Sequence, residues 1–292
     1  MKPPPFEYHR PRDLGEALAV LAEVGPDGKV LAGGQSLVPL LNMRLAAPRA
    51  LVDINRVTEL AYVTTVDGGV EVGALARHAD LERDEAAYAA IPLLRRATEH
   101  VAHPTIRNRG TTVGSIVHAD PSAEMPAVLA LLDGTVTLAS TAGRRTVSAA
   151  DFFVGPLESA VRPGELAVSA TFRTPPPGTG TAWLELSRRQ GDYAICGVGV
   201  RVTLDADLRV AAARAALISV GPTPVLVDLA DAVGGRHVDA ADWAAAGALV
   251  EASVEPEDDI HATAAYRRHL AGVLTARAAR SAAQEATAHV RA

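Results

Sequence analysis

The sequence predicts an α+β protein in which two α/β subdomains precede a C-terminal domain with a three-stranded antiparallel sheet and helices. Two observations carry this prediction. Up to about residue 175, short apolar strand patterns alternate with segments of helical spacing, which is typical of mixed α/β units. Beyond residue 180, three long strand patterns follow one another directly, and three helical patterns come after them.

The composition indicates a soluble globular protein with ample length for a large core. The chain has 292 residues, of which 48% are hydrophobic and 21% charged, and its length suggests two or three domains. A net charge of -6 leaves no broad basic surface, so we expect no sequence-independent binding of nucleic acid. A small or neutral ligand fits this charge better.

The N-terminal segment, the length of the apolar runs and the number of cysteines indicate where the protein is located and which redox groups it can hold. Residues 1–12 are proline-rich without the apolar core of a signal peptide, and no run reaches membrane-spanning length, so we expect a cytoplasmic protein without a membrane span. Cys196 is the single cysteine. This excludes an internal disulfide and a cysteine-ligated iron–sulfur cluster held by this chain alone.

Residues 1–55 predict a compact β-α-β unit. Asp13 followed by Glu16 is a helix start, and the apolar spacing continues to Gly25-Pro26. A strand at 29–32 runs into Gly33-Gly34, a short helical segment follows, and a second strand covers 50–54.

The glycine loop of this unit is the first candidate site. Adjacent glycines are unhindered at positive φ and can present a concave row of N–H donors to an anion. If Ser36 caps the following helix, the free N–H groups of the first turn lie beside the glycines, where a diphosphate would fit. On this stretch alone, a simple turn at Gly33-Gly34 explains the pattern equally well.

Residues 56–177 predict the second subdomain. A strand at 69–75 precedes helices at 78–89 and 92–102, which Pro92 separates. Strands at 134–140 and 165–173 come later, and the Pro/Gly run 175–180 marks the boundary between domains 1–177 and 178–292.

The polar segment 103–121 is the second candidate site. It is too irregular for a continuous strand or helix and too rich in hydrogen-bond donors for a bland linker. Asp120-Pro121 predicts a helix that starts with aspartate as the N-cap and continues through Leu132. On spacing alone, a capping role explains Asp120 better than a binding role.

After the boundary we expect strands at 181–188, 194–204 and 208–220 in an antiparallel meander. Helices at 224–233, 239–252 and 263–290 complete the C-terminal domain. Within the second strand, Gly197 and Gly199 begin a dinucleotide fingerprint, but valine stands where the third glycine belongs.

Other common motifs are absent from the sequence. It has no phosphate loop, no zinc-binding His-Glu-x-x-His and no Gly-x-Ser-x-Gly nucleophile elbow. Six scattered histidines are expected to lie at the surface or in caps, and no metal site is predicted; they are His9, His78, His237, His261, His269 and His289.

A series of motifs, in order along almost the whole chain, resembles the FAD-binding medium subunit of molybdenum hydroxylases. The series comprises Phe6 to Pro11, Ala32 to Pro39 with Met43 to Leu45, Leu51 to Ile54, Arg107 to Thr111, His118 to Pro121, Asp151 to Phe153, Arg188-Arg189 with Asp192 to Ile195, and Ala265 to Arg268. This family includes bacterial carbon monoxide dehydrogenase and the flavin domain of xanthine dehydrogenase. The resemblance implies a PCMH-type FAD-binding fold for domain 1–177.

The resemblance also implies a role for each matching residue. The first loop would wrap the FAD diphosphate with Ala32, Gly33, Gly34, Gln35, Ser36 and Leu37. The second contact to the diphosphate would come from Thr111, Gly114 and Ser115. The ribityl and ribose part would lie along His118 and Asp120, and the adenosine end near Glu124. The isoalloxazine would be tuned or gated by Arg189, Asp192 and Tyr193.

By the same resemblance, the chain is an electron-transfer subunit of a heterotrimer. A large subunit would hold molybdopterin, a small one [2Fe-2S] clusters, and the reduced FAD would pass electrons to NAD, a quinone or oxygen. FAD is expected to be noncovalent, because no histidine or cysteine stands where a link would form. The alternatives are a free-standing FAD-dependent oxidoreductase acting on a small molecule, and a fold that has lost its cofactor.

One position departs from the family pattern. Val113 stands where the family usually has the first glycine of Thr-Ile-Gly-Gly-Ser. A β-branched residue disfavours positive φ and keeps a phosphate farther from the backbone. We therefore expect weaker FAD binding or a reshaped loop at Val113.

Overall fold

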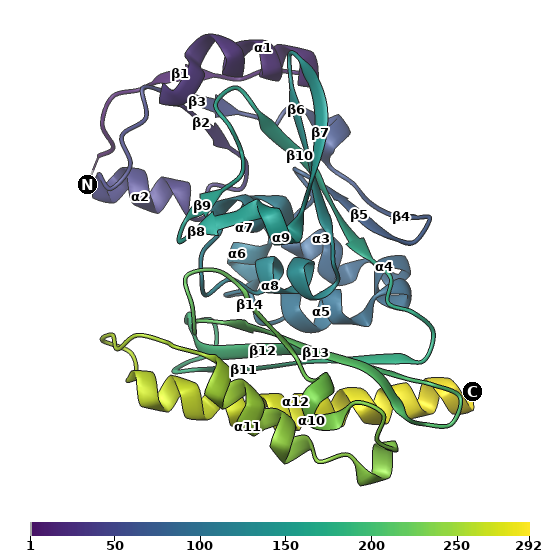
Figure 1. Cartoon of the computed structure of the whole chain (residues 1–292). Helices are drawn as coiled ribbons and strands as arrows, with labels where there is room; N and C mark the ends of the chain where they lie inside the picture. Colours follow the sequence, from purple (N-terminus) through teal and green to yellow (C-terminus); the bar gives the residue numbers. More distant parts are fainter. Residues whose placement is uncertain (1) are drawn as a thin grey trace.

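The computed structural model describes residues 2–292. The chain forms three stacked layers (Figure 1), with the N-terminal unit at the top, a five-stranded sheet and its helices in the middle, and a four-stranded sheet covered by two long helices at the bottom. The mixed α+β class predicted from the sequence is confirmed.

The N-terminal unit contains a three-stranded parallel sheet in the order β1-β3-β2. Its elements are β1 (Glu7–His9), α1 (Leu14–Val24), β2 (Gly28–Leu31), α2 (Leu37–Met43) and β3 (Ala50–Asp53). The predicted cap of α1 is confirmed, since the Asp13 carboxylate accepts a hydrogen bond from the Glu16 N–H at 2.8 Å. Gly25, at φ +58°, ends the helix.

The middle layer is an antiparallel sheet in the order β4-β5-β10-β6-β7. Its strands are β4 (Val63–Val66), β5 (Gly69–Gly73), β6 (Thr135–Ser140), β7 (Gly143–Ser148) and β10 (Leu166–Arg173). The sequence did not predict β4 and β7. Both are edge strands: in β4 two threonines separate the valines, and β7 is mostly polar, so neither shows an apolar run.

Short helices and one hairpin surround this sheet. They are α3 (His78–Arg83), α4 (Glu85–Ala90), α5 (Pro92–Thr98), α6 (Pro104–Arg107), α7 (Thr112–His118), α8 (Glu124–Leu131), α9 (Ala149–Phe152) and the strands β8 (Phe153–Gly155) and β9 (Glu158–Ser159). The predicted helix 78–89 is divided at Asp84, whose extended backbone breaks α3 while its side chain caps α4 at the Ala87 N–H.

The predicted helix start at Asp120-Pro121 is wrong. The helix α8 begins at Glu124, and the Asp120 carboxylate instead accepts from the Ser122 N–H at 2.8 Å in a turn that precedes it. The sequence also missed α7. Its first turn, Thr112 to Ser115, contains Gly114 and no run of apolar residues, so the sequence shows no helical pattern there.

The bottom layer has four strands instead of the predicted three. They are β11 (Thr179–Ser187), β12 (Ala194–Leu204), β13 (Val210–Ile218) and β14 (Val225–Asp228), in that order and antiparallel. The predicted helix 224–233 is therefore wrong. Val225 to Val227 is a β-prone run after Pro224, and only α10 (Ala230–Val233) is helical.

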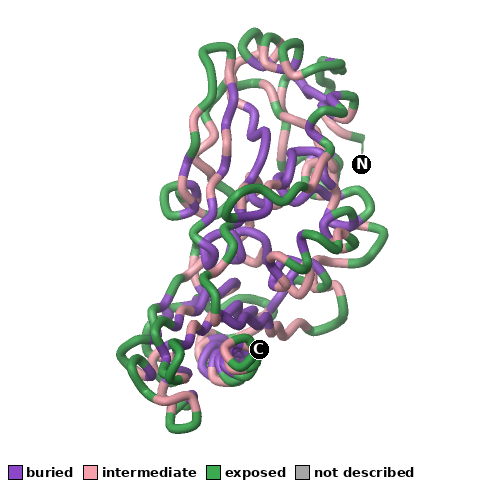
Figure 2. Tube along the Cα trace, turned by 90° about the vertical axis from the view of Figure 1, so that its right-hand side faces the viewer, coloured by how far each residue is buried: buried purple, intermediate pink, exposed green. Residues whose placement is uncertain are grey.

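The helices α11 (Trp243–Ser253) and α12 (Ala264–Arg291) cover the outer face of this sheet (Figure 1). Figure 2 shows burial along the strands and along one side of α12, where alanines such as Ala278 and Ala282 are fully buried. A Cβ at Gly180 would lie 2.1 Å from the Ala282 carbonyl oxygen, so β11 and α12 are in backbone contact. Among residues 2–292, no helix is long and apolar enough to cross a membrane.

An ion pair joins the middle layer to the bottom layer. Arg96 on α5 donates from Nη1 and Nη2 to the Glu285 carboxylate on α12, at 2.8 and 2.6 Å. The same carboxylate accepts from the Thr181 N–H at 2.7 Å. The division into domains 1–177 and 178–292 stays a prediction.

Candidate functional site

The first predicted loop connects β2 to α2. Gly34 has φ +74°, which only glycine adopts without strain. Ser36 stands at the N-cap position of α2, but its side chain makes no capping hydrogen bond, so the predicted cap is wrong. The first turn of α2 therefore keeps backbone N–H groups that Ser36 does not satisfy.

The second predicted loop leads into α7. The Thr111 hydroxyl caps this helix by accepting from the Gly114 N–H at 3.1 Å. A Cβ at Gly114 would lie 2.4 Å from that hydroxyl, so the close cap requires glycine. The second loop therefore also opens onto a helix start, at Thr112 instead of Pro121.

Val113 does not reshape this loop. It lies in the first turn of α7 at 2% exposure, packed in the core of the middle layer, and it is not among the residues with positive φ. The predicted conflict with a left-handed backbone is wrong, because this position is helical.

The two loops are in direct contact. A Cβ at Gly33 would lie 2.4 Å from the Arg109 carbonyl oxygen and 2.8 Å from the Gly110 Cα. The backbone N–H of His78 donates to the Gly110 carbonyl at 3.0 Å, which attaches the second loop to α3. Any side chain at position 33 would separate the loops.

Both loops line one cavity of about 650 Å³, a volume in the usual range for ligand sites. Every predicted site residue except one lines it, namely Ala32, Gly33, Gly34, Gln35, Ser36, Leu37, Thr111, Gly114, Ser115, His118, Asp120, Glu124, Asp192 and Tyr193. The exception is Arg189, which is exposed on the turn between β11 and β12. On that turn, Arg188 and Asp192 form an ion pair at 3.7 Å.

The cavity has further lining residues that the sequence did not reveal. They include Lys29, His78, Ala102, Ile106, Leu157 and Gly191. The expectation of a surface or capping role is wrong for His78, which is 3% exposed, and burial together with the Arg107 charge lowers its pKa to about 4. The apolar run Ala74 to Ala76, which precedes His78, was the feature of the sequence that could have indicated its burial.

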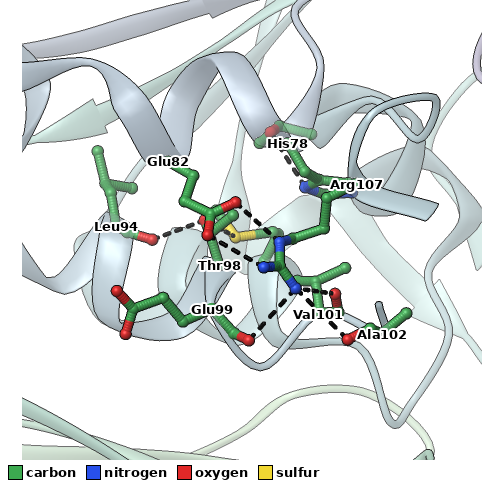
Figure 3. A network of polar contacts seen from close by, with 10 residues as sticks. His78, Glu82, Leu94, Thr98, Glu99, Val101, Ala102 and Arg107 are labelled. Atoms are coloured by element: carbon green, nitrogen blue, oxygen red, sulfur yellow. Dashed lines mark hydrogen bonds and ion pairs between the residues drawn. The ribbon is translucent and has the colours of Figure 1, made fainter. Parts of the chain in front are cut away.

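A buried arginine supports the segment that leads into the second loop (Figure 3). Arg107 on α6 donates to both oxygens of Glu82 at 2.8 and 3.0 Å and to the Val101 carbonyl at 3.1 Å. Because a buried guanidinium needs partners for its donors, this arrangement fixes the 99–107 segment beside the cavity.

Glu124 lines the cavity, and a second buried carboxylate, Glu185, lies near it. Burial and the nearby Glu185 raise the pKa of Glu124 to about 8, and burial raises the pKa of Glu185 to about 7. The Trp183 indole N–H donates to Glu185 at 3.1 Å, and His100 Nδ1 lies 4.0 Å from it. Tyr193 stands at the rim, and desolvation followed by the Asp120 and Glu124 charges raises its pKa.

The donor set fits a ligand with a central anion and an extended body. Two helix starts and a glycine loop supply backbone N–H groups, while aliphatic residues such as Leu37 and Leu157 supply an apolar lining. In the part of the chain that the structure describes, no group of three or more His, Cys, Asp or Glu side chains could hold a metal ion.

Comparisons with known proteins match both halves of the chain. Residues 4–172 match the family model "FAD binding domain in molybdopterin dehydrogenase", and residues 181–282 match "CO dehydrogenase flavoprotein C-terminal domain". The chain is 42% identical over 272 residues to the 6-hydroxypseudooxynicotine dehydrogenase complex subunit alpha of Paenarthrobacter nicotinovorans, covering 91% of this chain and 90% of that protein. It is 37% identical to the carbon monoxide dehydrogenase medium chain of Hydrogenophaga pseudoflava, covering 95% and 97%.

A solved structure extends the likeness to the whole fold. A chain of quinoline 2-oxidoreductase from Pseudomonas putida 86 superposes with a TM-score of 0.93 at 38% identity, over 98% of this chain and 99% of that one. Matches over both halves, identities above one third and a shared fold agree with one another. This chain therefore belongs to the FAD-binding flavoprotein subunits of the molybdopterin dehydrogenases, the family of the carbon monoxide dehydrogenase medium chains.

Proposed function

We propose that this chain transfers electrons through noncovalent FAD within a heterotrimeric molybdenum hydroxylase of the cytoplasm. A small subunit with [2Fe-2S] clusters would deliver the electrons, and NAD, a quinone or oxygen would accept them. A large subunit with molybdopterin would oxidise the substrate. When bound, FAD supplies the redox chemistry, and the protein supplies its position and electrostatic environment.

The observation that carries the proposal is the cavity between the two contacting loops. Residues 32–37 would hold the FAD diphosphate from one side, and Thr111, Gly114 and Ser115 from the other. His118 and Asp120 would follow the sugar chain, and Glu124 the adenosine end. Asp192 and Tyr193 would lie toward the isoalloxazine, with Arg189 exposed on the same turn.

The need for partner subunits is supported by the cysteine chemistry of this chain. Cys196 is fully buried, and burial raises the pKa of its thiol to about 12. Metal ligation requires the thiolate, which such a thiol does not supply. Two relatives that match more than 90% of this chain are named as a subunit of a complex and as a medium chain.

The test is purification of the tagged chain from its native cells, with a visible spectrum and mass identification of co-purifying chains. Flavin absorption overlaid with iron–sulfur absorption, together with two further chains, is expected. Acid precipitation should release the flavin into the supernatant. A single flavin-bearing chain that is reduced directly by a small-molecule substrate would refute the proposal in favour of a free-standing oxidoreductase.

A further inference from the structure

A chain of hydrogen bonds behind the cavity connects the two loops. It passes through Asn55, just after β3, and Arg77, just before α3, and neither residue lines the cavity. We propose that Asn55 and Arg77 are positioning residues that set the separation and orientation of the two loops for a diphosphate-bearing ligand. The proposal rests on the FAD site proposed above and deepens it.

The connection consists of three bonds in series. The Asn55 amide nitrogen donates to the Ala32 carbonyl in the first loop at 2.8 Å. The Asn55 amide oxygen accepts from Arg77 Nη2 at 2.7 Å. Arg77 Nη1 then donates to the Arg109 carbonyl in the second loop at 2.6 Å. We call these three bonds the loop strap.

The orientation of the Asn55 amide follows from its neighbours. A guanidinium has only donors, so the amide oxygen must face Arg77 and the amide nitrogen must face the first loop. The same nitrogen lies 2.6 Å from Asp53 Oδ1, and the Asn55 backbone N–H also donates to that oxygen at 3.0 Å. Asp53 is itself buried, so the strap has a fixed base; the Tyr8 hydroxyl donates to the other Asp53 oxygen, Oδ2, which does not contact Asn55.

The strap acts on the groups that face the ligand through peptide geometry. A trans peptide directs its C=O and N–H to opposite sides. By holding the Ala32 carbonyl, Asn55 directs the Gly33 N–H the other way. By holding the Arg109 carbonyl, Arg77 fixes the surface against which Gly33 packs.

The backbone around Arg77 strengthens this coupling. The Arg77 N–H donates to the Asp80 carboxylate at 2.9 Å, and the next residue, His78, donates its N–H to the Gly110 carbonyl. Residue 77 is therefore attached to the second loop by main chain and side chain together. Only the side chain reaches on to the first loop.

The test compares the full-length chain with Asn55→Asp, Arg77→Lys and the double variant, each as FAD-free protein. Asn55→Asp is nearly isosteric and keeps the acceptor for Arg77, but it places an oxygen against the Ala32 carbonyl and against Asp53 Oδ1. Arg77→Lys keeps the charge and cannot make both bonds. Tyr8→Phe is the matched control, because it removes the hydrogen bond to Asp53 and leaves the strap intact.

Each strap variant should raise the FAD dissociation constant about tenfold or more, and Tyr8→Phe less than about twofold. Because the bonds act in series, the double variant should bind FAD about as weakly as either single variant. The melting temperature of the FAD-free Arg77→Lys protein should stay close to that of the parent, whereas Asn55→Asp should lower it through the new oxygen beside Asp53. ADP, which carries the diphosphate without the flavin, should show the same losses as FAD.

Two results would overturn the strap. One is an FAD dissociation constant that stays unchanged in Asn55→Asp and Arg77→Lys. The other is a loss of FAD affinity that is additive in the double variant and that accompanies a lower melting temperature of Arg77→Lys, which would indicate a purely structural role. A parent chain that binds neither FAD nor ADP would instead refute the proposed site, and the strap with it.

Discussion

Replacing the buried Glu185 by glutamine should change how the stability of the protein depends on pH. The Glu185 side chain is 3% exposed and lies close to Glu124, which is also buried. Burial raises the pKa of Glu185 to about 7, well above its ordinary value of 4.5. Folding therefore holds a proton on this carboxyl that the unfolded chain releases earlier.

The sign follows from that difference. Below about pH 4.5 the Glu185 carboxyl is protonated in both the folded and the unfolded protein, so its raised pKa does not lower the free energy of unfolding. As the pH rises from 4.5 to about 7, the unfolded chain ionises first, so the free energy of unfolding falls. Each pH unit in this window is worth about 1.4 kcal/mol. The full window gives about 3 kcal/mol as an upper bound, and we expect about 2 kcal/mol after local relaxation and water entry.

Urea unfolding at pH 5 and pH 8, followed by tryptophan fluorescence, measures this effect. Glu185→Gln should match the parent within about 0.5 kcal/mol at pH 5 and exceed its stability by about 2 kcal/mol at pH 8. Glu285→Gln is the control of opposite sign. Desolvation opposes ionisation of Glu285, but the hydrogen bonds from Arg96 and Thr181 outweigh it and lower its pKa, so this variant should be less stable than the parent at pH 8. A stability difference between Glu185→Gln and the parent that is the same at both pH values would refute the reasoning.

Three further predictions concern packing and the cavity. Gly33→Ala should weaken FAD binding about tenfold, because its Cβ would displace the Arg109 carbonyl; an FAD titration with unchanged affinity would contradict the contact between the loops. Arg96→Ala should lower the free energy of unfolding, measured by urea unfolding, by about 2 kcal/mol. This loss is smaller than for a fully buried ion pair because Arg96 and Glu285 are partly exposed. A stability equal to that of the parent would show that the ion pair is dispensable. Val113→Gly should destabilise the fold by about 2–4 kcal/mol, because core packing and helix propensity are lost. Tighter FAD binding by this variant would instead indicate that the valine obstructs the loop.

Local signals in the sequence predicted much of the fold. The cap at Asp13, the strand run into Gly33-Gly34 and the meander of the C-terminal layer all depend on residues adjacent in the chain. The errors arose where tertiary contacts decide. The polar edge strand β7 exists because β6 pairs with it, and β14 exists because β13 does.

The candidate site was predictable in its residues but not in its construction. The two loops carry motifs that resemble those of a known family, and the cavity brings nearly all of the named residues together. Capping was predicted for Ser36 and Asp120 and is not observed, because a short polar residue before an apolar run has the pattern of an N-cap wherever the helix actually starts. Asn55 and Arg77 carry no motif, since their importance lies in bonds between segments distant in sequence.

The walls of the cavity are far apart along the chain, which has a consequence during synthesis. The first loop is complete at residue 37, whereas the rim at Gly191 to Tyr193 lies more than 150 residues later. At bacterial and eukaryotic elongation rates this interval lasts about 10–30 s. During that time the chain lacks the rim, so a ligand enclosed by all of the walls can be captured only after β11 and the turn that follows it have left the ribosome.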